Sequence, residues 1–274
     1  MEKEFLTRGL EDEIQDLREM EDAIENWHPG SSVDCVILGY EKQKVKVLLL
    51  KMEFDDLRML PGGMIPKNKD LRDAAYHVLK VRTGLESVFL KQFHTFGRKD
   101  RPSIMDNSFS EKGRQYLDHV KLNYPKYYDW MNRRYITTGY FALVDISKVK
   151  VEYSSGQMNE KYDWVAIDNI PDLIMDHDRI IRKCLDFIRV QLNYLPISMN
   201  LLPDEFTMKD LQKLYEAFLN EKLERSNFQR KMLKLGIFDR LKKKMSGAAN
   251  KAPYLYRFDK DKYNELVKKG IGVL

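Results

Sequence analysis

Hydrophobic residues recur at intervals of three and four positions from residue 4 to residue 27, and acidic and basic side chains fill the positions between them. This spacing predicts an amphipathic helix, because it places the apolar side chains on one face. His28, Pro29 and Gly30 are expected to end the helix. Residues 1–31 are therefore interpreted as an N-terminal helical segment.

Two apolar runs rich in β-branched residues follow, SSVDCVILGY at residues 31–40 and KVKVLLLKM at residues 44–52, with a short polar stretch between them. They predict a hairpin whose strands are largely buried. The next segment, LPGGMIP at residues 60–66, is expected to be a turn, because paired glycines and flanking prolines interrupt regular structure.

Residues 70–82 predict a helix, with Asp70 as N-cap and Gly84 as the C-terminal stop. The same part of the chain predicts three more strands and a long closing helix, at residues 92–97, 135–146, 163–167 and 173–192. Residues 102–133 form a polar, aromatic-rich stretch between two of the strands. It is interpreted as an inserted helical excursion, and connections of that length usually serve a function.

The C-terminal part predicts a second domain at residues 206–274, after a proline-containing linker at residues 195–205. One amphipathic helix is expected at residues 206–223, with Thr207 as N-cap. A second helix should start with Ser226 or Asn227 as cap and stop at Gly236. Its inward-facing residues are expected to be Phe228, Met232 and Leu233. Beyond it, residues 240–258 are expected to form a basic, turn-rich loop that ends in an alternating strand.

The net charge of +5 is unevenly distributed. From residue 201 onward there are 17 basic and 10 acidic residues, so the remainder of the chain is slightly acidic. No apolar run approaches the roughly 20 residues that a membrane helix needs. The acidic N-terminus does not resemble a signal peptide, so a cytoplasmic protein without membrane contact is expected. Cys35 and Cys184 lie in apolar surroundings and are expected to be buried thiols.

Residues 63–85, GMIPKNKDLRDAAYHVLKVRTGL, have the 23-residue frame of a Nudix box, whose pattern is G-x5-E-x7-R-E-U-x-E-E-x-G-U with U apolar. In that family, three glutamates on one helix face hold a divalent metal that activates water against a diphosphate. The glycines and apolar positions of the frame match here, but the four acidic positions hold Lys69, Val78, Val81 and Arg82. The sequence therefore predicts no catalytic residue, no metal and no cofactor.

The order of elements around this box resembles a Nudix domain, so the predicted fold class is α/β: a Nudix-type α/β/α sandwich with a mixed sheet at residues 32–194, followed by a winged helix-turn-helix domain. The C-terminal part, from NLLPDEFTMKDL through APYLYRF, resembles the winged helix of Nudix-related transcriptional regulators, particularly the Bacteroidetes arabinose-responsive type.

This resemblance implies a homodimer that binds a double-stranded DNA operator. It also implies a small-molecule effector in the Nudix cleft, either a sugar such as L-arabinose or a nucleotide product such as ADP-ribose. By position, the expected ligand-binding residues are Asp34, Lys51, Gly62, Gly63, His77, Phe96, Arg98 and Tyr140. The insertion lies where relatives have a short loop, so it could cover the cleft, alter the choice of ligand or extend the dimer interface.

The second helix of the C-terminal domain can enter a major groove, where Arg, Gln and Asn read base edges and lysines contact phosphates. The expected DNA-binding residues are Arg225, Ser226, Asn227, Gln229, Arg230, Lys231, Lys234, Lys251, Tyr254 and Arg257. The sequence thus predicts a DNA-binding transcriptional regulator whose non-catalytic Nudix-like domain senses a sugar or a sugar-derived metabolite.

Two other functions remain open at this point. The chain could be a divergent Nudix hydrolase that acts on a nucleoside diphosphate derivative and uses Asp100, Asp106 or Glu111 as metal ligands. It could also be a protein-interaction module whose basic C-terminal part binds an acidic partner. A magnesium-dependent hydrolysis assay tests the first alternative, and sequence-selective DNA binding would exclude the second.

Overall fold

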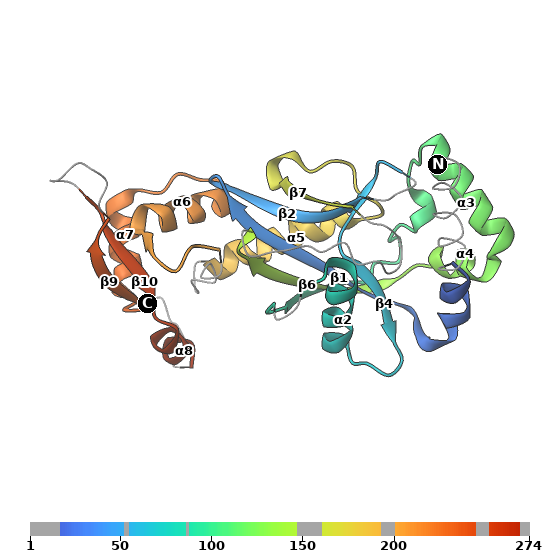
Figure 1. The fold of residues 1–274 in the computed structure, drawn as a ribbon, viewed down its shortest axis with the longest axis horizontal. Helices are drawn as coiled ribbons and strands as arrows, with labels where there is room; N and C mark the ends of the chain where they lie inside the picture. Colours follow the sequence, from blue (N-terminus) through green and yellow to red (C-terminus); the bar gives the residue numbers. More distant parts are fainter. Residues whose placement is uncertain are drawn as a thin grey trace, which may run out of the picture. The chain divides into compact units, whose positions relative to one another are not determined.

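The computed structural model describes residues 17–51, 55–85, 88–146, 161–192, 201–244 and 252–268 (Figure 1). These residues form two compact units. The first unit consists of the described residues within 1–37, 47–142 and 150–184. The second unit consists of those within 38–46, 143–149 and 185–274. The predicted linker at 195–205 lies partly outside the described residues. Among the helices that the structure describes, none is both long enough and apolar enough to cross a membrane.

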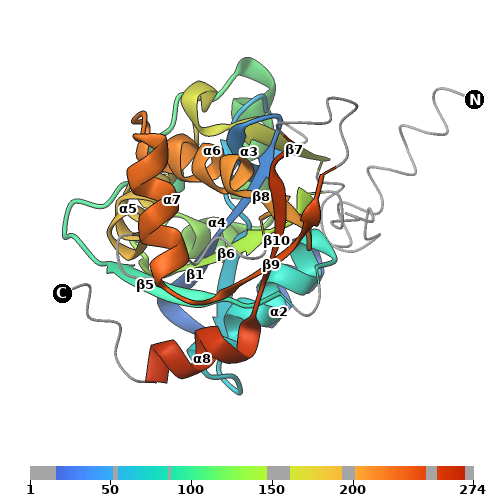
Figure 2. The same cartoon turned by 90° about the vertical axis from the view of Figure 1, so that its left-hand side faces the viewer.

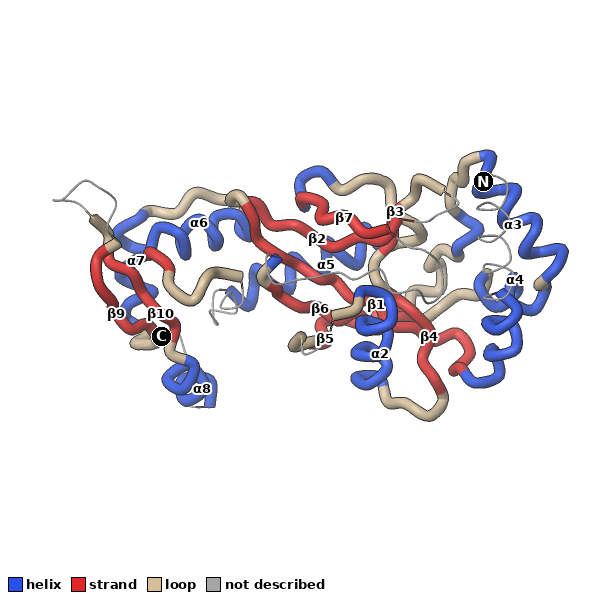
Figure 3. Tube along the Cα trace, in the orientation of Figure 1, coloured by secondary structure: helices blue, strands red, loops and turns tan. Residues whose placement is uncertain are grey.

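Seven of the described strands form one sheet, in the order β3–β2–β1–β6–β5, with β4 paired to β1 and β7 paired to β2 (Figures 1 and 3). Their bounds are β1 Trp27–Glu41, β2 Lys44–Lys51, β3 Arg58–Met59, β4 Gly62–Pro66, β5 Lys91–Phe96, β6 Ile136–Val144 and β7 Lys161–Ala166. The predicted hairpin is β1 and β2, and the three later predicted strands are β5, β6 and β7. The apolar runs of β1 and β2 are buried, as expected from their composition.

The prediction of a turn at residues 60–66 is wrong, because Gly62–Pro66 forms strand β4, which pairs antiparallel with β1. The two glycines serve close packing here and do not make a turn. A Cβ atom at Gly62 would overlap the carboxylate of Asp34 on the paired strand. One at Gly63 would stand 2.9 Å from a methyl carbon of Val78. Glycine is therefore needed in this strand for the approach of its neighbours.

The N-terminal helix is described from residue 17 to residue 23, and a short 3-10 turn, η1 at Ile24–Asn26, follows it. Residues 4–16 of the predicted helix lie outside the described residues. His28, Pro29 and Gly30 do not form a separate stop, because β1 already begins at Trp27. The pairing of β1 is irregular between Trp27 and Ser32, and Gly30 has a φ of 67°. Proline and glycine are tolerated at such an irregularity.

Helix α2, Leu71–Thr83, has the predicted ends. The side chain of Asp70 accepts a hydrogen bond from the Asp73 amide, and Gly84 closes the helix in the left-handed conformation. Both cysteines are free and buried, which confirms the prediction, and burial raises the pKa of each thiol.

The closing helix α5, His177–Leu192, begins later than predicted, because Leu173 forms a bridge to Arg58 of β3.

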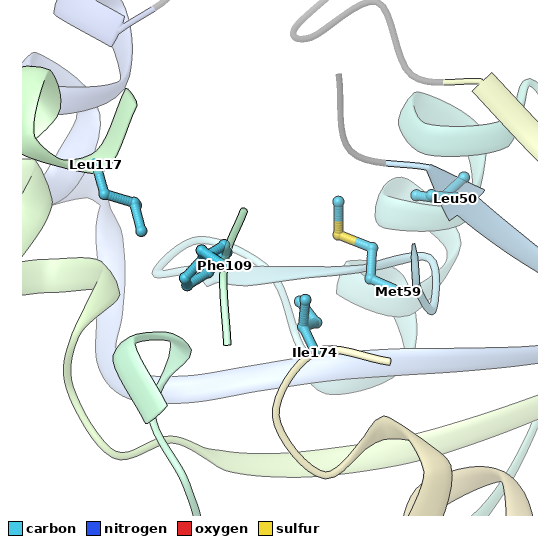
Figure 4. Close-up of a cluster of buried hydrophobic side chains, with 5 residues drawn as sticks. All are labelled: Leu50, Met59, Phe109, Leu117 and Ile174. Atoms are coloured by element: carbon cyan, nitrogen blue, oxygen red, sulfur yellow. The ribbon is translucent and has the colours of Figure 1, made fainter. Parts of the chain in front are cut away.

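The insertion is helical, as predicted. It contains η2 Ile104–Asp106, α3 Glu111–Asn123 and α4 Pro125–Met131. Phe109 and Leu117 of the insertion pack with Leu50, Met59 and Ile174 in one buried cluster (Figure 4). The insertion therefore shares its core with the sheet.

The second unit contains β8 Phe206–Thr207, α6 Met208–Leu219, α7 Arg225–Lys234, β9 Phe238–Lys243, β10 Tyr254–Phe258 and α8 Lys260–Lys268 (Figure 2). Its described strands form a sheet in the order β8–β10–β9. The predicted order of helix, turn, helix and hairpin is confirmed, and Thr207 caps α6 in a capping box with Asp210. Helix α8 was not predicted.

Three details of this unit were predicted wrongly. The N-cap of α7 is Glu224, whose carboxylate accepts hydrogen bonds from the Ser226 and Asn227 amides, so neither of these two residues is the cap. Leu233 is 39% exposed, whereas Phe228 is buried against Tyr215. Residues 240–243, expected in a loop, belong to β9, because the register with β10 extends to Lys243.

Candidate functional site

A cavity of about 280 Å³ opens in the first unit. Its walls come from the N-terminal helix, β1, β3, β4, α2, the insertion, and the start of α5 with the residues just before it. Four of the predicted ligand residues line it: Asp34, Gly62, Gly63 and His77. Concave sites with an apolar lining and a few convergent polar groups are the usual form of a small-molecule site, so this cavity is the candidate effector site.

Asp34 is the central polar residue of the cavity, and only 5% of it is exposed. Its Oδ2 accepts a hydrogen bond of 2.7 Å from the Thr137 hydroxyl, which in turn accepts one from Ser32. The guanidinium of Arg101 lies 3.7 Å from the same carboxylate and forms a closer ion pair, 2.9 Å, with Asp176. A buried charge needs such partners, so the network holds Asp34 in one position.

His177 is another buried polar residue that lines the cavity. Its Nδ1 accepts a hydrogen bond of 2.9 Å from the Leu60 amide, which leaves the proton of the neutral ring on Nε2. That Nε2 lies 3.7 Å from Asp34 Oδ1. Burial lowers the pKa of His177, although Asp34 opposes the shift. The ring is therefore neutral at pH 7 and presents a donor beside the Asp34 carboxylate.

The face of α2 that would hold metal in a Nudix hydrolase also lines the cavity, through His77, Val78, Val81 and Arg82. Val78 is buried and packs at Gly63, and the Arg82 guanidinium lies 3.5 Å from the Met59 sulfur. Within the described ranges, no three acidic, histidine or cysteine side chains gather in a way that could hold a metal ion. The helix thus offers the cavity apolar surface and positive charge.

The other predicted ligand residues lie elsewhere. Phe96 and Arg98 line a second, smaller hollow of about 190 Å³, together with His94 and Arg179. Lys51 forms an ion pair with Asp56 at 2.9 Å. Tyr140 is buried in β6, and its hydroxyl points to Gln92 of the paired strand. These four residues are therefore separate from the lining of the larger cavity.

Sequence reasoning missed most of the cavity wall. The missed polar residues include Arg101 and His177, and the missed apolar and aromatic residues include Met20, Trp27, Tyr116 and Tyr127. No motif marks them, because they come from the N-terminal segment, the insertion, the connection just before the insertion and the start of α5. The aromatic richness of the insertion was the one signal that could have pointed to some of them.

The three acids of the hydrolase alternative are each engaged in local contacts. Asp100 forms an ion pair with Arg98. Asp106 accepts a hydrogen bond from the Ser103 amide in a capping box, and Glu111 forms an ion pair with Arg114. These contacts stabilise turns and helix ends of the insertion.

In the second unit, α7 presents an exposed polar face. Six of its seven predicted DNA-binding residues are exposed: Arg225, Ser226, Asn227, Arg230, Lys231 and Lys234. The seventh, Gln229, is half-buried. The Arg230 guanidinium donates a hydrogen bond of 3.0 Å to Asn227. On the opposite side of the helix, Phe228 is buried and its ring packs against Tyr215. The arrangement leaves the basic face open to a partner.

The hairpin β9–β10 carries further positive charge. Arg240 and Lys243 of β9 lie over the ring of Tyr254, at 4.6 and 5.6 Å from its centre. Both basic residues are exposed and were missing from the predicted site, although their basic run is visible in the sequence. Arg257 is exposed and forms an ion pair with Glu205. Lys251 lies outside the described residues.

The comparisons with known proteins address both units. Residues 198–258 match the family model described as the NrtR DNA-binding winged helix domain. The "ADPR responsive transcriptional repressor NtrR" of Acinetobacter baylyi is 25% identical over 244 residues, which are 86% of this chain and 84% of that protein.

Solved structures support the same fold. The crystal structure of Shewanella oneidensis NrtR superposes with a TM-score of 0.61 and 20% identity, over 85% of this chain and 96% of the other. The structure of the same protein in complex with a 27-mer DNA superposes with a TM-score of 0.59 and 20% identity, over 85% of this chain and 95% of the other. A MutT/nudix family protein from Enterococcus faecalis superposes with a TM-score of 0.55 and 19% identity, over 85% of this chain and 88% of the other. The predicted fold class, a Nudix-like α/β domain followed by a winged helix, is confirmed.

Proposed function

We propose that this chain, a member of the Nudix-related winged-helix transcriptional regulators of the NrtR type, represses transcription at a DNA operator and is controlled by a nucleotide-derived effector. The observation that carries the proposal is the face of α2. Val78, Val81 and Arg82 line the cavity where a hydrolase has carboxylates, so the cavity can bind a diphosphate without activating water on it.

The effector class follows from the same face and from the A. baylyi relative. Arg82 lines the cavity and brings positive charge toward a diphosphate, while Asp34 and His177 offer an acceptor and a donor to hydroxyl groups. The relative is described as responsive to ADP-ribose. A nucleotide sugar such as ADP-ribose meets these features. L-arabinose, the sugar suggested by the family resemblance, has no diphosphate for Arg82.

We propose that the protein reads DNA as a homodimer in the cytoplasm. The exposed face of α7 would enter the major groove, where Asn227 and Arg230 contact base edges and Lys231 and Lys234 contact phosphates. Two such helices would contact half-sites about one helical turn apart. Effector binding would favour one dimer geometry and so change the affinity for the operator.

Fluorescence anisotropy with labelled DNA from upstream of the protein's own gene and neighbouring genes tests the proposal. The protein is expected to bind one such fragment selectively, with affinity that falls steeply as salt increases. Arg230→Ala should weaken selective binding, whereas Lys222→Ala, an exposed lysine just before α7, should leave selectivity unchanged. ADP-ribose should shift the binding curve and L-arabinose should not. Selective binding that no nucleotide sugar changes would refute the effector half of the proposal.

An assay for hydrolysis separates this function from the enzyme alternative. The protein is incubated with ADP-ribose and magnesium, and AMP formation is followed by chromatography. We expect no turnover above the uncatalysed rate, because α2 offers no carboxylate to the cavity. Steady turnover that needs magnesium and is lost in Asp106→Asn or Glu111→Gln would favour the hydrolase.

A further inference from the structure

We infer that the insertion and the N-terminal helix together form a subsite for a planar aromatic group, the base of a nucleotide effector, and thereby determine which effectors the cavity accepts. This inference rests on the proposed function and assigns one part of the ligand to one wall of the site.

The wall is apolar and aromatic throughout. The insertion lines the cavity with Ile104, Tyr116, Leu117, Tyr127 and Met131, and the N-terminal segment adds Met20 and Trp27. No charged side chain reaches the described cavity lining from residues 17–27 or 102–133. Aromatic rings and methionine sulfur are the groups that pack best against a planar ring.

The polar lining residues come from other elements. Asp34 belongs to β1, Arg82 to α2, and His177 to the start of α5. A ligand that uses all of the cavity therefore needs a polar part for these residues and an apolar part for the insertion wall. A monosaccharide has only the first part, and its hydroxyls would lose hydrogen bonds to water against the apolar wall. A nucleotide sugar has both parts.

The wall is held in place from the sheet side. Asp55, just after β2, accepts hydrogen bonds from the amide and the hydroxyl of Ser110, the N-cap of α3. The side chain of Asn107 accepts a hydrogen bond of 2.7 Å from the Met175 amide. Leu117 of α3 belongs to the same buried cluster as Met59 and Ile174, both of which also line the cavity (Figure 4). These contacts fix the start of the insertion against the sheet.

The N-terminal helix holds the wall from its other side. The carboxylate of Glu21 accepts hydrogen bonds from the amides of Lys126 and Tyr127, in the first turn of α4. Leu17 and Met20 pack with Tyr127 and with residues of α3 in a second apolar cluster. The aromatic wall is therefore ordered before a ligand arrives, and binding need not spend free energy on ordering it.

Isothermal titration calorimetry on the full chain tests the inference with two probes, ADP-ribose and ribose 5-phosphate, which has no base. Tyr116→Ala should weaken ADP-ribose binding about tenfold, because one stacking surface is lost, and should leave ribose 5-phosphate binding unchanged. Tyr116→Phe keeps the ring and should retain affinity. Leu122→Ala is the matched control, since Leu122 is on the same helix and is 81% exposed.

The outcomes separate this inference from the proposed function. If wild-type protein binds ADP-ribose and folded Tyr116→Ala and Met20→Ala variants bind it equally well, the subsite is refuted and the proposed function stands. Equal weakening of both probes would also refute it, because the residues would then act on the sugar or on the fold. If the wild-type protein binds DNA but no nucleotide, the subsite and the effector half of the proposed function both fail. Thermal melts of each variant establish that it is folded.

Discussion

Replacing Gly62 with alanine tests how closely β4 approaches the polar end of the cavity. The added methyl group would overlap the Asp34 carboxylate and would stand 3.1 Å from the Val33 carbonyl oxygen. The carbonyl belongs to the backbone of a central strand and cannot move easily, so Asp34 must turn away. Its hydrogen bond from Thr137 and its position beside Arg101 would then be lost.

The expected cost combines the lost hydrogen bond with the overpacking of the site. A hydrogen bond to a charged group contributes about 1.5–3 kcal/mol, and overpacking a well-filled site costs about 1–3 kcal/mol. We therefore expect Gly62→Ala to lower the free energy of unfolding by roughly 3–5 kcal/mol, a large share of the about 5–15 kcal/mol typical of a folded domain. Effector binding should be lost in whatever fraction remains folded.

Urea unfolding followed by tryptophan fluorescence measures this change, because all three tryptophans, Trp27, Trp130 and Trp164, belong to the first unit. Gly97→Ala is the control, since its Cβ would stand 3.6 Å from Ile136, an ordinary contact. In an Asp34→Ala background, Gly62→Ala should cost only about 1 kcal/mol, because the overlapping carboxylate is gone. A Gly62→Ala variant as stable as Gly97→Ala would refute the close approach, and so would a cost that persists without Asp34.

Three further predictions concern pH and helix capping. Because burial lowers the pKa of His177, the unfolded chain binds more protons between that pKa and about 6.5. Stability should therefore decrease as the pH is lowered through this window, and an NMR titration midpoint for His177 at or above 6.5 would contradict the prediction. Lys213 chiefly lowers the pKa of Glu216 to about 2, so the second unit should lose stability as pH falls from 4.5 toward 2. Glu216→Gln should remove that dependence in amide exchange at Leu223; an unchanged slope would refute it. Thr207→Ala should destabilise α6 by about 1 kcal/mol and Thr207→Ser by much less, as measured by amide exchange of α6; equal losses would refute the capping role.

Local signals made parts of the fold predictable. The caps of α2 and α6 are Asp70, Gly84 and Thr207. Each forms its capping hydrogen bond with a residue three or four positions away, so the local sequence is enough to predict it. The buried strands follow from their apolar composition. Where a long-range contact decided the outcome, the prediction was wrong. Gly62 looked like a turn residue, yet it lies in β4 because Asp34, distant in sequence, occupies the space of a side chain.

The candidate site was predictable only where the Nudix frame reached. Asp34 and His77 were found because the frame places β1 and α2 around the cavity. Arg101 was not found because it lies in the connection after β5, which has no periodicity. His177 was not found because the periodicity of α5 does not show that the first residue of the helix faces the cavity. In the second unit, Glu224 was missed as a cap because its sequence context offered Ser226 and Asn227 as more usual capping residues.

The substitutions on α2 also bear on how such a protein can change over evolutionary time. Val78 is buried against Gly63, so a lone glutamate at that position would place an unpaired anion in an apolar contact before any metal could be held there. Restoring the metal-binding set would require acids at positions 78, 81 and 82 together, and a single change at Val78 would destabilise the protein without providing a metal site. Under the proposed function, loss of hydrolysis would therefore be self-reinforcing: selection could change what the cavity recognises in small steps, while a return to catalysis would pass through unstable intermediates.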